Sequence, residues 1–136
     1  MPSWVKDGSV YHIRIRAAAD YFTKLTDDRI ALHITESVQA YHQTNRWHCR
    51  LFLLMPDHLH ALLAFPPGKH MFEVIGGWKG YHAKKLGVRW QNNFFDHRIR
   101  CDESLDEKEA YIRNNPVVKG LCQRAEDWPW VIGPLE

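Results

Sequence analysis

The chain has few cysteines and no long apolar run among its 136 residues. Its three cysteines, Cys49, Cys101 and Cys122, form no CxxC pair. This excludes a disulfide framework and a cysteine zinc knuckle, and it indicates a reducing compartment. No apolar stretch reaches the roughly 18 residues of a membrane span, and the first ten residues have no signal-peptide core. We therefore expect a cytoplasmic protein with no membrane partner.

Internal repeats, low-complexity segments and linkers are also missing. Apolar residues make up 45% of the chain and charged residues 25%, which is typical of a globular protein and excludes disorder, collagen and coiled coil. The length suits one domain over residues 1–136, with a core at about 9–122. The aromatic and proline-rich tail, 123–136, is expected to pack over the domain without forming an element of its own.

Charge is unevenly distributed. The formal net charge is only +2, but segment 69–100 holds seven basic residues and two acidic ones, a local balance of +5. Aromatic residues are interleaved with these bases, as on a surface that binds a polyanion with stackable bases. Taken alone, the segment is better interpreted as a solvated helix face with core aromatics.

Hydrophobic periodicity predicts the order of the secondary structure. Alternation indicates strands, helical spacing indicates helices, and capping residues mark where helices begin. We expect a strand over Tyr11–Ala17, a helix capped by Thr26 and running to Gln43, and strands over Trp47–Met55 and His58–Phe65. A helix over Met71–Tyr81, weakened by Gly76 and Gly77, and a strand over Phe94–Arg100 follow. The last helix begins at the Ser104/Glu107 capping box and runs toward Asn115, where Pro116 ends or kinks it.

This β-α-β-β-α-β order predicts an α+β fold. The expected architecture is a ferredoxin-like antiparallel sheet with helices on one face, plus a C-terminal helix that carries Tyr111. Such folds host nuclease, metal-binding and RNA-binding functions alike, so the architecture does not decide the activity.

Two histidines begin the strand predicted over His58–Phe65. His58 and His60 project from one face while Leu59 points to the other, so two imidazoles stand side by side after a turn. Such a pair can ligate one divalent ion. The HxH pattern alone is weak, however, and two partly exposed histidines at a strand end explain it equally simply.

Tyr111 and Asn115 lie four residues apart and therefore share one face of the last helix. A phenol can act as a nucleophile in phosphoryl transfer, and an amide oxygen could be a third metal ligand beside two histidines. The alternatives are a half-buried aromatic at Tyr111 and a helix C-cap at Asn115. Asn114 competes for the ligand role, since spacing alone does not separate it from Asn115.

Four ordered motifs resemble those of REP-associated tyrosine transposases, relatives of the single-tyrosine HUH transposases of small bacterial insertion sequences. Residues 55–63 (MPDHLHALL) resemble that family's MPNHVHLLL, and residues 111–121 (YIRNNPVVKGL) its YIxxNPVRAGLV. Residues 95–100 (FDHRIR) resemble YHDHxIR, and residues 127–130 (DWPW) begin like DWPWSS. The chain departs from the pattern at Asp57, Val118–Lys119 and Val131–Ile132. The last departure puts DNA contacts of the tail in doubt.

The resemblance implies a metal-dependent endonuclease and strand transferase that acts on single-stranded hairpin DNA of palindromic repeats. It makes Tyr111 the nucleophile of a covalent 5′-phosphotyrosine intermediate, His58 and His60 metal ligands, and Asn115 the third ligand. The cofactor would be Mg²⁺ or Mn²⁺: imidazoles favour manganese, whereas cellular abundance favours magnesium. Association with the nucleoid and a homodimer are further expectations. The residues expected to contact DNA are Arg14, Arg16, Lys79, Lys84, Lys85, Arg98 and Arg100.

Three other interpretations stay open on the sequence. The protein could be a metal nuclease that uses activated water, with Tyr111 structural. It could also be a hairpin-binding module that has lost catalysis, although the intact set of two histidines, a tyrosine and an asparagine argues against this. A plain structural domain would leave the match to four motifs unexplained.

Overall fold

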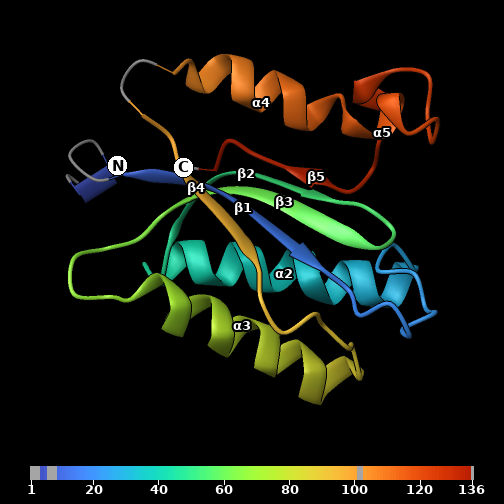
Figure 1. The fold of residues 1–136 in the computed structure, drawn as a ribbon, viewed down its shortest axis with the longest axis horizontal. Helices are drawn as coiled ribbons and strands as arrows, with labels where there is room; N and C mark the ends of the chain where they lie inside the picture. Colours follow the sequence, from blue (N-terminus) through green and yellow to red (C-terminus); the bar gives the residue numbers. More distant parts are fainter. Residues whose placement is uncertain (1–3, 6–8, 101–102, 136) are drawn as a thin grey trace.

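The computed structural model describes residues 4–5, 9–100 and 103–135. Its strands and helices occur in the predicted order (Figure 1). The elements are β1 (Val10–Arg16), α2 (Asp28–Gln43), β2 (His48–Leu54), β3 (His58–Ala64), α3 (Met71–Leu86), β4 (Phe95–Arg98), α4 (Leu105–Arg113), α5 (Asn115–Val118), a short 3₁₀ turn (Ala125–Asp127) and β5 (Val131–Ile132).

The five strands form one antiparallel sheet in the order β4-β1-β3-β2-β5. The first four of these positions are the ferredoxin-like arrangement, so the predicted α+β fold is confirmed. The expectation that the tail forms no element was wrong, because Val131 and Ile132 pair with Leu53 and Phe52 of β2. Two residues suffice here, since β2 offers an unpaired edge on which a short segment can bond.

Two helices cover one face of the sheet, and α4 and α5 lie on the other (Figure 1). The first face follows from the alternation of β1, whose Ile13 and Ile15 are buried in a core shared with Ile34 of α2 and Ile75 of α3. The second face buries a smaller cluster made by Leu51, Leu53, Met55, Leu62 and Ile112 of α4. Ile112 therefore packs helix α4 against this face of the sheet.

Helix boundaries differ from the predictions in small ways. Asp27, not Thr26, caps α2, and its carboxylate accepts the Ile30 N–H at 3.3 Å. Both residue types cap well, so sequence could not choose between neighbours. Helix α3 continues through Gly76 and Gly77 to Leu86 and ends at Gly87, which is in the left-handed region with φ 71°. Ser104 caps α4 as predicted, accepting the Glu107 N–H at 3.1 Å.

The described cysteines, Cys49 and Cys122, are free thiols. Cys101 lies outside the described residues. Within the described part of the chain, no helix is long and apolar enough to cross a membrane.

Candidate active site

A cavity of about 470 Å³ opens where β1 ends and β3 begins, beneath α4 and α5. It lies on the sheet face that α4 covers. Its lining includes most of the residues that sequence singled out for chemistry: Arg14, Arg16, His58, His60, Tyr111 and Asn115, together with Met55, Pro56, Asp57, Lys119 and Leu121. The phenol and the histidine pair therefore face the same space, on the same side of the sheet.

The histidine pair is almost entirely buried, with 5% of His58 and 4% of His60 exposed. Strand periodicity sends both rings toward the cavity, whereas Leu59 between them enters the core on the opposite face. Burial lowers the pKa of His60 to about 3, and the neighbouring His58 and His12 add to this. Burial also lowers the pKa of His58, although Asp57 opposes the shift. Both rings are neutral at pH 7, the form that can ligate a metal.

Each ring makes a hydrogen bond through its Nδ1 atom. Nδ1 of His58 lies 2.7 Å from Oδ1 of Asp57, and Nδ1 of His60 lies 2.9 Å from Nε2 of His12. His12 is itself buried, and burial lowers its pKa to about 4, helped by the charges of Lys108 and Arg14. The Nε2 atom of His58 has no hydrogen-bond partner among the described residues.

A break between two helices brings Asn115 to the histidines. Asn114, not Asn115, is the C-cap of α4, and Asn115 begins α5, with Pro116 in its first turn. Nδ2 of Asn115 lies 3.3 Å from Nε2 of His60. The structure thus removes the C-cap interpretation of Asn115. It also separates Asn115 from Asn114, since only Asn115 lines the cavity.

Tyr111 stands on the last turn of α4 with 64% of its surface exposed. Its hydroxyl makes no hydrogen bond with any described residue. A large aromatic side chain left this exposed at the mouth of a polar cavity is unlike a core residue. The half-buried structural role considered for Tyr111 therefore does not match its surroundings.

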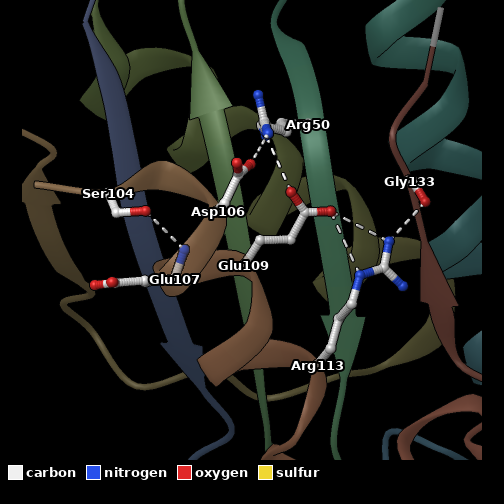
Figure 2. A network of polar contacts seen from close by, with 7 residues as sticks. All are labelled: Arg50, Ser104, Asp106, Glu107, Glu109, Arg113 and Gly133. Carbon is white, nitrogen blue, oxygen red and sulfur yellow. Dashed lines mark hydrogen bonds and ion pairs between the residues drawn. The ribbon is translucent and has the colours of Figure 1, made fainter.

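Polar contacts hold α4 against the sheet next to this tyrosine (Figure 2). The Glu109 carboxylate accepts from Arg50 Nε of β2 at 3.1 Å and from Arg113 Nη2 at 3.3 Å. Arg113 also donates to the Gly133 carbonyl of the C-terminal segment at 2.8 Å. Arg50 stands at a shift in the β2–β3 register between Cys49 and Leu51. Such a bulge redirects a side chain, and Arg50 extends from it toward α4.

The donor set can be tested for its fit to a divalent cation. Oδ1 of Asn115 is buried without a hydrogen-bond partner in the described part of the protein. An orphaned acceptor of this kind is costly unless something binds it. Among the described residues, no group of three or more His, Cys, Asp or Glu side chains is arranged to hold a metal ion. A third protein donor beside the histidines would therefore be this amide, and two imidazoles with one amide oxygen fit manganese or magnesium.

Only some of the expected DNA-contacting residues gather at the cavity. Arg14 and Arg16 line it, and neither forms an ion pair with a described residue. Lys79, Lys84 and Lys85 lie on α3, on the opposite side of the sheet (Figure 1). Lys79 donates to the Gln91 carbonyl. On and after the edge strand β4, Arg98 is exposed and Arg100 pairs with Glu103.

Sequence reasoning missed three residues of the site. Lys119 lines the cavity but follows the helix break, and Asp57 was noted only as a departure from a motif. His12 alternates along its strand with the apolar residues Tyr11 and Ile13, which predicts the polar side of that strand but no role. Its alternation with Arg14 and Arg16 was the available signal, because residues two apart on a strand share a face.

Comparisons with known proteins point to one family. A family model described as "Transposase IS200 like" matches residues 8–115. A REP-associated tyrosine transposase of Escherichia coli (strain K12) is 29% identical over 93 residues, which cover 65% of this chain and 52% of that protein. A Haemophilus influenzae protein given the same name provisionally is 24% identical over 135 residues, covering 81% of this chain and 76% of that protein.

A solved structure provides the comparison of folds. The structure of a REP-associated tyrosine transposase bound to a REP hairpin superposes with a TM-score of 0.78 at 19% identity, covering 91% of this chain and 76% of that chain. At this identity the likeness establishes the fold alone.

Proposed function

This chain belongs to the IS200-like transposase family, and on that premise we propose that it cleaves and rejoins single-stranded DNA at palindromic hairpins through a bond between Tyr111 and a 5′ phosphate. The family membership makes it a transposase-like enzyme that processes DNA, and the two curated relatives confirm the resemblance to REP-associated tyrosine transposases. The observation that supports this chemistry most directly is the shared cavity, which Tyr111, His58 and His60 line together with Arg14 and Arg16.

In the proposed reaction, the Tyr111 hydroxyl attacks a phosphodiester in line with the leaving 3′ oxygen. The phosphorus–oxygen bond to Tyr111 forms as the bond to the 3′ oxygen breaks; the phenol gives up its proton to solvent, and the leaving 3′ oxygen takes one up to become a 3′-hydroxyl. Attack by a 3′-hydroxyl on the phosphotyrosine reverses the step and rejoins strands without ATP. Much of the protein's task is to position the phosphate and neutralise charge.

Five side chains would prepare the cavity for that phosphate. His58, His60 and Asn115 would hold a divalent cation, which supplies Lewis-acid polarisation of the phosphate when bound. Arg14 and Arg16 would neutralise the phosphate oxygens, because both lie at the cavity without a carboxylate partner in the described chain.

A second cavity, of about 340 Å³, shares Arg16, Pro56 and Asp57 with the first and includes Phe22, which is 90% exposed. Such an aromatic can stack on a base.

Single-stranded DNA is the favoured substrate, since a strand end and one helix do not readily reach a phosphate inside a regular duplex. The structure that resembles this chain at 0.78 TM-score is described as bound to a REP hairpin, which supports a hairpin as the ligand here. The tyrosine and both histidines lie at one cavity of one chain. The proposed site is therefore complete without a second copy that exchanges its helix.

The test is a covalent adduct. The full chain is incubated with a labelled single-stranded hairpin and Mn²⁺, then run on a denaturing gel. We expect a protein–DNA adduct that Tyr111→Phe abolishes and that the matched control Tyr81→Phe, an exposed tyrosine on α3, retains. Cleavage without an adduct would instead support a water nucleophile. Hairpin binding without cleavage, unchanged in His58→Ala, would support a binding module.

A further inference from the structure

Two residues outside the proposed catalytic set contact the histidine pair from behind. His12 lies on β1 and Asp57 on the turn before β3, and they bond the Nδ1 atoms of His60 and His58. On His60 this is not the nitrogen that Asn115 contacts. His12 is also held firmly: its ring stacks on His60 at 5.2 Å between centroids and meets the Phe95 ring edge-on at 5.7 Å.

Only one of the two ring nitrogens of a neutral imidazole carries a hydrogen, so the other nitrogen is the one that can bind a metal. For His58 the assignment follows directly from its partner. A carboxylate only accepts, so the 2.7 Å contact with Asp57 requires the hydrogen on Nδ1 of His58. The lone pair of His58 is then on Nε2, the atom with no partner among the described residues.

For His60 the 2.9 Å contact with His12 could run in either direction. The second contact of the ring decides between them. With the Asn115 amide oriented as it is here, Nδ2 lies 3.3 Å from Nε2 of His60 and can only donate, so Nε2 accepts. The hydrogen of His60 is therefore on Nδ1 and is donated to His12, whose own hydrogen is then on its Nδ1.

We propose that His12 and Asp57 are positioning residues that hold both histidines in the Nδ1–H form, so that two Nε2 lone pairs face one divalent cation. This inference rests on the proposed function, in which His58 and His60 are metal ligands. An imidazole whose back nitrogen is bonded in this way is fixed in both tautomer and orientation, and losing such a partner commonly weakens metal binding by about 10- to 100-fold.

The pairs of variants are chosen to separate hydrogen bonding from packing. His12→Phe keeps a ring against His60 but has no acceptor, whereas His12→Gln offers an amide oxygen. Asp57→Ala removes the acceptor from an exposed turn, and Asp57→Asn restores one. His33→Phe, on α2 at the opposite side of the sheet, controls for the loss of a histidine elsewhere.

Two measurements on the full chain test the proposal. Long-range ¹H–¹⁵N NMR of the metal-free protein should find both His58 and His60 as Nδ1–H tautomers, with His60 becoming a mixture in His12→Phe. Calorimetric titration with Mn²⁺ should give dissociation constants raised about 10- to 100-fold in His12→Phe and Asp57→Ala. His12→Gln, Asp57→Asn and His33→Phe should stay within about threefold of the wild type.

The outcomes are distinct. Wild-type protein that binds no Mn²⁺ would refute the metal site of the proposed function, while the NMR measurement would still decide the tautomers. An Nε2–H tautomer at either histidine in the wild type, or unchanged Mn²⁺ affinity in both His12→Phe and Asp57→Ala, would overturn the present inference. If His12→Phe does not fold, the Asp57 pair decides by the same titration, because that side chain is exposed.

Discussion

Glu109 offers the sharpest test of how the tyrosine helix is held. Its carboxylate is 16% exposed and joins α4 to Arg50 of β2 and, through Arg113, to the C-terminal segment (Figure 2). Glu109→Ala removes the shared acceptor and leaves both guanidinium groups without it. Arg113 keeps only its bond to the Gly133 carbonyl.

The size of the effect follows from burial. Breaking a fully buried ion pair costs about 3–5 kcal/mol, whereas an exposed pair contributes about 0.2–1 kcal/mol. The side chains of Arg50 and Arg113 are 36% and 34% exposed, so water partly replaces what they lose. We therefore expect Glu109→Ala to lower the free energy of unfolding by about 2 kcal/mol, between those limits.

Urea denaturation at pH 7 measures this loss, with Glu107→Ala as the control. Glu107 lies two residues earlier on the same helix, with an exposed side chain that bonds no described residue. Its replacement should cost about 0.5 kcal/mol through the helix dipole. The rate of adduct formation should fall in Glu109→Ala and stay near wild type in the control, because Tyr111 is carried by the helix that Glu109 fixes. Equal destabilisation by the two variants would refute the reasoning.

Three further predictions concern packing, pH and salt. Ile112→Ala, which empties a fully buried position under α4, should lower the free energy of unfolding by about 3 kcal/mol, whereas Val118→Ala at a 75% exposed position should change it by less than about 0.5 kcal/mol in the same urea titration. Burial lowers the pKa of His82 to about 4, so the unfolded chain takes up a proton below pH 6.5 that the folded chain refuses. The free energy of unfolding should therefore decrease as the pH is lowered. Between pH 7 and pH 5 this decrease should be about 2 kcal/mol smaller in His82→Gln than in wild type. Equal pH slopes in the two proteins would contradict the lowered pKa of His82. Hairpin affinity should weaken with salt, and Arg16→Ala should reduce the slope of log affinity against log salt by about one, as measured by fluorescence anisotropy.

The order of elements was predictable because each signal is local. Alternation along β1 reports which of its residues enter the core, and Ser104 followed by Glu107 marks the start of α4 without reference to the rest of the chain. The same locality placed His58 and His60 on one face of a strand and Tyr111 and Asn115 on one face of a helical segment. The motifs then indicated that the two pairs act together.

What the sequence by itself determined is therefore which side chains share a face within each element. Only the tertiary structure decided which faces meet across the sheet. It brought α4 over the histidine side through Ile112, chose Asn115 over Asn114 by breaking the helix between them, and set His12 behind His60 from a strand far away in sequence. Only the tertiary structure likewise decided the bulge that turns Arg50 toward Glu109 and the pairing of the short β5 with β2. Spacing along a chain fixes direction within one element, whereas distances between elements depend on how their side chains fill the space between them.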